Sequence, residues 1–141
     1  MRISVLSIII CFVLLSTSCR EDERIIPSTP NQVTPGVNGT SVKGFFLLNE
    51  GNMGSNKATL DYFDYETGIY HKNIYAERNP GVVQELGDVG NDIQIYGNKL
   101  YAIINCSHFV EVMNVETAKH ITQISIPNCR YIVFKDKYAY V

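Results

Sequence analysis

A repeat of about 40 residues is the feature of this sequence that most constrains its fold. Residues 93–102 align with residues 132–141 at an offset of 39 residues, and each segment holds two short β-prone runs around a tight turn. A unit of this length that contains four short strands is typical of a β-propeller blade. The sequence therefore predicts an all-β fold, a β-propeller of four-stranded antiparallel blades.

An earlier copy of the repeat is also visible. Residues 45–49 (FFLLN) resemble residues 101–105 (YAIIN), and residues 61–68 (DYFDYETG) resemble residues 111–118 (EVMNVETA). The first offset is 56 residues and the second is 50, so the earlier copy carries six extra residues, which lie in the loop 49–57.

The best-defined unit predicts four strands joined by tight turns. Gly97-Asn98 is a two-residue hairpin signal, and residues 116–119 join the third strand to the fourth. The second strand is apolar on both faces, as expected where a blade lies between two neighbours. An antiparallel meander or sandwich is the alternative, since short strands with even turns also describe those folds. The predicted strands are 92–96, 99–105, 109–115 and 120–126.

The number of repeats leads us to expect that the chain is the truncated N-terminal part of a longer protein. About seven blades are expected in the full-length protein, whereas residues 41–141 supply two and a fraction. The alignment ends inside a strand, because Val141 matches Ala102. The innermost strand of the first blade is then expected from the missing C-terminal part. Without it, sheet edges and apolar blade faces would be exposed.

The N-terminus is typical of a bacterial lipoprotein precursor. Residues 1–18 are the predicted signal peptide: Arg2 is its basic region, residues 3–15 are its apolar region, and Ser16-Thr17-Ser18 are small residues before Cys19. Cys19 is the predicted lipidation site, although Ser16 replaces the Leu usual at that place in the lipobox. Plain secretion after Ser18 is the alternative. The apolar run is shorter than the roughly 20 residues needed to span a bilayer.

Residues 19–40 predict a flexible tether that follows the lipidated cysteine. They are rich in Pro, Ser, Thr, Asn and Gly and have no hydrophobic period. The three acids of residues 20–24 resemble the acidic export signal of lipoproteins shown on the cell surface, and an ordinary solvated charge run is the alternative. We therefore expect a lipid-anchored protein of the outer membrane, exposed at the cell surface.

Composition bounds the remaining choices. Loss of Arg2 with the signal peptide leaves 11 of the 12 Lys and Arg against 14 Asp and Glu, a net charge of −3. A protein with this net negative charge is not expected to bind nucleic acid. Nine Tyr, six Phe and no Trp, with many Val and Ile, fit a β-rich domain.

Strand direction brings four connections to one end of the predicted blades: 49–57, 86–91, 105–108 and 127–131. Their amides, acids, glycines and aromatic ring suit a polar ligand with close backbone approach, and ordinary loop composition is the alternative. The candidate ligand-binding residues are Asn49, Glu50, Asn52, Met53, Asn56, Asp88, Asn91, Asn105, His108, Arg130 and Tyr131.

Other chemistries have less support. Cys106 and Cys129 are expected at the same end of neighbouring strands, which leaves a disulfide or two inert thiols as the alternatives. With His108 they make only three zinc ligands without the usual spacing. Asp88, Asn91 and Asp92 lack the spacing of an EF-hand and favour a turn over a calcium site. His71, His108 and His120 fall in separate units without a nucleophile motif, so no catalytic constellation and no enzyme activity are expected.

Several segments resemble a known family: NEGNMG at 49–54, GDVGNDI at 87–93, DYETG at 64–68 and NVETA at 114–118. They are similar to those of the YncE-like β-propeller surface lipoproteins of Bacteroides, most closely the BtuG corrinoid-binding lipoproteins. The resemblance implies a protein that captures cobalamin or another corrinoid and passes it to a TonB-dependent outer-membrane transporter, with no resident cofactor. It implies that amides of the loop-rich end face the corrinoid amides, while Tyr131 or Met53 packs on the ring or its side chains. The alternatives are a propeller that binds glycan or protein partners and, third, a propeller lyase or lactonase.

Overall fold

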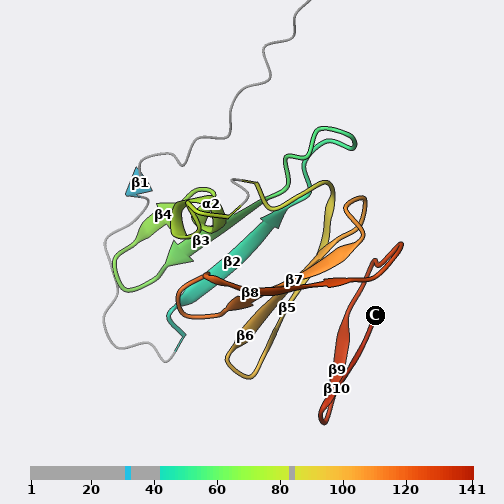
Figure 1. Cartoon of the computed structure of the whole chain (residues 1–141). Coiled ribbons are helices and arrows are strands. Elements are labelled where there is room, and N and C mark those ends of the chain that lie inside the picture. The colour runs from blue at the N-terminus through green and yellow to red at the C-terminus, as the bar shows by residue number, and fades with distance from the viewer. Residues whose placement is uncertain (1–30, 33–41, 83–84) are drawn as a thin grey trace, which may run out of the picture.

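The computed structural model describes residues 31–32, 42–82 and 85–141, and its regular structure is almost entirely antiparallel β-sheet (Figure 1). Two four-stranded sheets and a two-stranded hairpin are formed. The predicted signal peptide, the acidic run after it and Cys19 lie outside the described residues, as does most of the predicted tether.

The second sheet is the unit that the sequence predicts best. Its strand order is β5-β6-β7-β8, and each strand is antiparallel to the next. Tyr96 pairs with Lys99 across the hairpin, and Gly97 has a φ of 61°, which confirms the predicted two-residue turn. The four predicted strands are confirmed: β5 is Gly90–Tyr96, β6 is Lys99–Ile104, β7 is Phe109–Asn114 and β8 is His120–Ser125.

The first sheet repeats the pattern of the second. Strands β2 (Gly44–Asn49), β3 (Thr59–Asp64) and β4 (Ile69–His71) take the places of β6, β7 and β8. The outermost strand is β1 (Asn31–Gln32), which pairs antiparallel with β4. The predicted tether therefore contributes a short strand, which its composition did not indicate. At the other side β2 is the edge strand of the sheet among the described residues, and no described strand fills the place beside it that β5 takes beside β6 in the second sheet.

The second sheet packs against a neighbour on each of its faces. Leu100, Ala102 and Ile104 of β6 are fully buried in one apolar cluster with Leu60 of β3, between the two four-stranded sheets. Ile103 of the same strand belongs to a second cluster on the opposite face. The prediction that this strand is apolar on both sides because its blade lies between neighbours is therefore confirmed.

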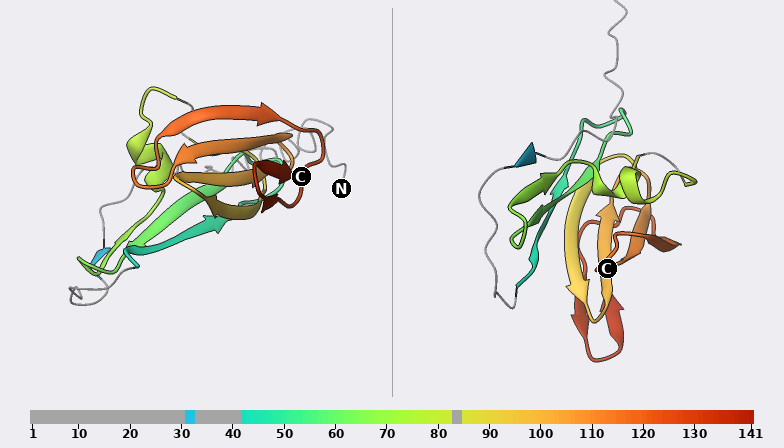
Figure 2. Two further views of the ribbon diagram at one scale, coloured as in Figure 1. Left: turned by 90° about the horizontal axis from the view of Figure 1, so that it is seen from below. Right: turned by 90° about the vertical axis from the view of Figure 1, so that its left-hand side faces the viewer.

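The C-terminal hairpin consists of β9 (Val133–Lys135) and β10 (Tyr138–Tyr140) and packs on the second sheet. The ring of Phe134 stacks on Tyr96, with centroids 4.6 Å apart and planes at 7°. Ile132 donates its backbone N–H to Asp92 Oδ2 at 2.9 Å. Figure 2 shows the three units following one another as in a propeller.

A short helix, α2 (Ile74–Arg78), joins the first sheet to the second and was not predicted. Asn73 caps its first turn by accepting the N–H of Ala76. Asn79 at its end donates to the carbonyl of Ala118 at 2.9 Å and accepts the N–H of His120 at 2.8 Å. These two bonds attach the connection to the hairpin between β7 and β8.

Apolar side chains remain exposed on the outer faces of the described units. Phe45 and Leu47 lie on the free face of the first sheet, and Val133, Tyr138 and Tyr140 lie on the C-terminal hairpin. The architecture is all-β and propeller-like, with its blade-like sheets packed face to face. No helix among the described residues is long and apolar enough to cross a membrane.

Candidate functional site

The structure brings the four predicted connections to one end of the sheets, where hydrogen bonds link each to the next. We call this surface the loop face and define it as residues 49–57, 86–91, 105–108 and 127–131. It lies where β2, β6 and β8 end and where β3, β5 and β7 begin.

The long loop of the first sheet is held by the connection that follows α2. The backbone N–H of Gly54 donates to both carboxylate oxygens of Asp88, at 3.1 and 2.8 Å. Gly90 donates its N–H to the carbonyl of Glu50 at 3.0 Å, and Ala58 donates to that of Gly87 at 2.9 Å. The loop that is longer than its counterpart in the second sheet is therefore anchored along its length.

The same connection is bonded to the turn between β6 and β7. Asn105 donates its backbone N–H to the carbonyl of Val89 at 2.9 Å, and Cys106 donates to that of Asp88 at 3.1 Å. Asp88 donates its own N–H to the hydroxyl of Ser107 at 2.8 Å. Asp88 thus contacts both neighbouring loops, through its carboxylate on one side and its backbone on the other.

The turn between β6 and β7 is also hydrogen-bonded to the segment that follows β8. The side chain of Asn105 donates to the carbonyl of Cys129 at 2.8 Å. His108 Nδ1 accepts the backbone N–H of Asn128 at 3.2 Å, which leaves Nε2 as the protonated ring nitrogen of a neutral imidazole. All four connections therefore form one continuous hydrogen-bonded surface.

The geometry divides the predicted site residues into two groups. Four of them build the framework: Asn49 donates to Thr59 and Asp61, both at 2.9 Å, and Asp88, Asn105 and His108 make the bonds described above. The others turn side chains toward solvent or lie half-buried at the surface. The exposed members are Glu50, Asn52, Met53, Asn56, Arg130 and Tyr131, and Asn91 is half-buried.

Two of the exposed residues provide large contact surfaces. Met53 is 79 % exposed and Tyr131 is 66 % exposed. Each comes from a different connection: Met53 follows the exposed Asn52, and Tyr131 follows the exposed Arg130. A thioether and a phenol ring held in this way can pack on a flat or apolar part of a ligand while neighbouring groups bond to its polar atoms.

The two cysteines are free thiols in the structure, so the disulfide alternative is not formed. Cys129 is buried, and its Sγ lies 3.5 Å from the carbonyl oxygen of Phe109, whereas Cys106 Sγ lies 3.6 Å from Asn105 Oδ1. The two sulfur atoms thus have different neighbours. Burial raises the pKa of the Cys129 thiol and keeps it protonated.

The acids weighed as calcium ligands instead accept backbone hydrogen bonds. Asp88 accepts the N–H of Gly54, and Asp92 accepts those of Ile93 at 2.8 Å and Ile132. Within the described ranges, no group of three or more His, Cys, Asp or Glu residues is arranged to hold a metal ion.

Two buried carboxylates were not among the predicted site residues. Asp61 is 8 % exposed and accepts hydrogen bonds from Tyr70 at 2.8 Å and from the backbone of Asn73 at 2.8 Å. Glu111 is completely buried. The two acids occupy equivalent places in the repeat, 50 residues apart, which is the signal that could have identified them. Asp61 also accepts the side-chain N–H of Asn49 and so supports the framework of the loop face, whereas Glu111 contributes to packing.

Comparison with known proteins gives one family. Residues 43–141 match a family described as a domain of unknown function, DUF5074. No curated protein matches the chain. The match covers both described four-stranded sheets except β1, together with the C-terminal hairpin. The chain therefore belongs to the DUF5074 family.

Proposed function

We propose that this protein is a non-enzymatic, lipid-anchored binding protein of the outer membrane that captures a small polar ligand on its loop face. The observation that carries this proposal is the continuous hydrogen bonding of four connections, which holds exposed polar, aromatic and thioether groups on one surface. A surface fixed in advance loses little conformational entropy when it binds a ligand.

A corrinoid such as cobalamin is the ligand that best fits these groups. The resemblance of the NEGNMG and GDVGNDI segments to those of corrinoid-binding lipoproteins first suggests it. A corrinoid has a flat ring system surrounded by amides, which need hydrogen-bond donors and acceptors at several points. Asn52, Asn56 and Arg130 offer such groups, and Met53 and Tyr131 offer exposed apolar surface.

Delivery to a TonB-dependent transporter completes the proposed function. Cys19 followed by a tether would keep the loop face within reach of a transporter in the same membrane. Substitution Cys19→Ala is expected to release the protein from membranes, as measured by fractionation, while its ligand affinity stays unchanged. A fall in affinity would contradict a simple tether.

Calorimetric titration of the purified protein with cobalamin tests the proposal. We expect saturable binding at micromolar ligand or below. Tyr131→Ala should weaken it at least about tenfold, because a large exposed anchor is lost. Tyr138→Ala is the matched control, since Tyr138 is 59 % exposed but lies on the C-terminal hairpin outside the loop face, and it should bind as the wild type does.

Two results would contradict the corrinoid proposal. One is the absence of heat at micromolar cobalamin, and the other is equal weakening by both tyrosine variants. Binding of an oligosaccharide in place of cobalamin would favour the glycan alternative, in which an exposed tyrosine stacks on a sugar ring.

A further inference from the structure

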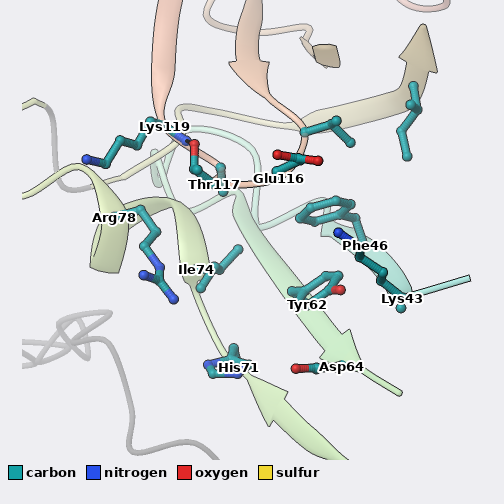
Figure 3. Close-up of a pocket in the computed structure, with 14 residues that line it drawn as sticks. Lys43, Phe46, Tyr62, Asp64, His71, Ile74, Arg78, Glu116, Thr117 and Lys119 are labelled. Carbon is teal, nitrogen blue, oxygen red and sulfur yellow. Dashed lines mark hydrogen bonds between the residues drawn. The ribbon is translucent and has the colours of Figure 1, made fainter. Parts of the chain in front are cut away.

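A cavity of about 720 Å³ lies between the two four-stranded sheets, at the end opposite to the loop face (Figure 3). Its walls come from the beginning of β2, the end of β3, helix α2 and the hairpin between β7 and β8. We call it the hairpin cavity. Its volume is in the range of small-molecule sites, and no residue of the loop face lines it.

The floor of the hairpin cavity is apolar and aromatic. The rings of Phe46 and Tyr62 lie with centroids 4.8 Å apart, and Ile74 of α2 lies on the neighbouring wall. Gly44 makes room for the paired strand and for the tyrosine, because a Cβ atom there would lie 2.1 Å from the carbonyl oxygen of Phe63 and 2.5 Å from the Tyr62 hydroxyl oxygen. The position of the Tyr62 ring therefore depends on a glycine at the start of β2.

Three basic side chains from three separate segments line the cavity. Lys43 precedes β2, Arg78 ends α2, and Lys119 lies in the hairpin between β7 and β8. Figure 3 shows Lys43 beside Phe46 and Arg78 extending from the helix on the side of His71, while the side chain of Lys119 extends away from the aromatic rings. Two cations from distant parts of the chain beside one apolar floor favour a negatively charged group near them.

Two acids, Asp64 and Glu116, line the cavity against three Lys and Arg side chains. Asp64 Oδ1 accepts the backbone N–H groups of Glu66 at 2.8 Å and Thr67 at 3.4 Å, and its charge also acts on Tyr62 and His71. Glu116 is exposed on the hairpin. Glu77 is not a lining residue; its carboxylate lies 3.4 Å from Arg78 Nε and 3.9 Å from His71 Nδ1. The terminal nitrogens of the Arg78 guanidinium can therefore bond to another partner.

The aromatic floor is not a requirement of the repeat. At the next junction between units, the place of Tyr62 is taken by Val112, and the cross-strand partner of Val112 is Tyr101, as Phe46 is that of Tyr62. The second sheet therefore forms without a ring at the place of Tyr62. The cross-strand pair of two rings at this place is found in the first sheet and not in the second.

We propose that the hairpin cavity is a second binding site, for an organic anion that carries a carboxylate on a flat apolar body. The body would lie against Phe46 and Tyr62, and the carboxylate would bond to Arg78 and Lys43. Burial, together with the charge of Asp64, raises the pKa of Tyr62, so its hydroxyl stays protonated and can donate. This site is independent of the function proposed for the loop face.

Fluorescence anisotropy of naphthalene-2-carboxylate, titrated with the purified full chain, tests this proposal. The chain has no tryptophan, so the naphthalene signal has no competing indole emission. We expect saturable one-to-one binding, and an affinity for the neutral 2-naphthamide that is at least about fivefold weaker. Arg78→Gln should weaken binding of the carboxylate by about fivefold. The matched control Arg130→Gln, on the loop face, should leave it unchanged.

A second variant separates binding from folding. Tyr62→Val introduces the residue found at the equivalent place of the second sheet, so the sheet should still form, as checked by thermal unfolding followed by circular dichroism. Naphthalene-2-carboxylate should then bind at least about tenfold more weakly, because half of the aromatic floor is lost. Unchanged affinity in a folded Tyr62→Val protein, or equal affinity for acid and amide, would overturn the proposal.

Discussion

Oε1 of the buried Glu111 carboxylate lies 2.5 Å from Nδ1 of His120 on the neighbouring strand. Asp61 and Tyr70 make the corresponding contact in the first sheet, at 2.8 Å. An acid and a ring at equivalent places of the repeat thus join β3 to β4 in the first sheet and β7 to β8 in the second.

Removal of His120 should destabilise the protein. His120→Ala removes the partner of Glu111 Oε1 and leaves the buried carboxylate with the hydroxyl of Tyr75 alone. Because the histidine is 30 % exposed, we expect a loss of about 2 kcal/mol in the free energy of unfolding. Urea denaturation measures this loss. Thr122→Ala, an exposed position on the same strand, should change it by less than about 0.5 kcal/mol. A His120→Ala protein as stable as the Thr122→Ala control would show that the pair contributes little.

Asp64 should make stability depend on pH in the acid range. Burial alone would raise its pKa, but hydrogen bonds from the Thr67 side chain and from the backbone of Glu66 and Thr67, with the charge of His71, lower it. The native state therefore favours the ionised form, so its contribution is present above the ordinary pKa of 3.8 and is lost as pH falls through the lower native value. Asp64→Asn should flatten the decline in stability between roughly pH 5 and pH 2.

Asn114 provides the reciprocal test of this pH dependence. It occupies in the second sheet the place that Asp64 has in the first. Its side chain accepts the N–H groups of Glu116 and Thr117, both at 3.0 Å, so asparagine suffices for the turn. Asn114→Asp should steepen the same decline in a series of urea titrations. Parallel stability curves for wild type and both variants would contradict the assigned role of Asp64.

Loss of the Asp88 carboxylate should loosen the long loop of the first sheet. In Asp88→Ala, hydrogen exchange should accelerate at Gly54 and its neighbours, because the amide loses both acceptors, while the strands of the second sheet keep their protection. Asp92→Ala is the matched control and should accelerate exchange at Ile132 instead. Exchange at Gly54 that is unaffected by Asp88→Ala would show that other bonds hold the loop.

Gly51 should tolerate no side chain. Its φ is 77°, and a Cβ atom would lie 2.7 Å from the carbonyl carbon of Lys57, so Gly51→Ala should cost about 1–2 kcal/mol of unfolding free energy. Gly81→Ala, where a Cβ would meet nothing within 4 Å, should be within about 0.5 kcal/mol of wild type. Thermal unfolding compares the two, and equal Tm values would contradict the strain at Gly51.

The two thiols should react at different rates. Burial raises the pKa of Cys129, and its side chain is almost inaccessible, so iodoacetamide should modify Cys106 first in the native protein. Peptide mass mapping at increasing times measures both rates. In urea the difference should disappear, and a native Cys129 that reacts as fast as Cys106 would place it at an open surface.

The repeat was sufficient to predict most of the fold. The continuous apolar run of β6 and the Gly97-Asn98 turn predicted strands of the second sheet, because both signals act over a few residues. Helix α2 was not predicted because its five residues are too few to show a helical period, and its caps Asn73 and Asn79 also suit a turn. The pairing of β1 depends on a contact with β4 that is distant in sequence.

The end of the sheets that carries the loop face was predicted from strand direction alone. The roles of individual residues on it were not, because sequence does not distinguish an amide that bonds to its own framework from one that faces solvent. Asn49 and Asn52 lie three positions apart, yet Asn49 bonds into the first sheet and Asn52 is exposed. The hairpin cavity was missed for a similar reason, since its cations come from separate segments.

Asp88 and Asp92 lie on one short segment, and each carboxylate holds a different neighbouring unit. The residues that bond the units together are therefore different from the residues whose side chains are exposed on the loop face. Met53, Arg130 and Tyr131 can then be exchanged, by divergence between relatives or in the laboratory, without releasing the framework. A protein built in this way can acquire a new binding preference through a few substitutions while its architecture stays the same.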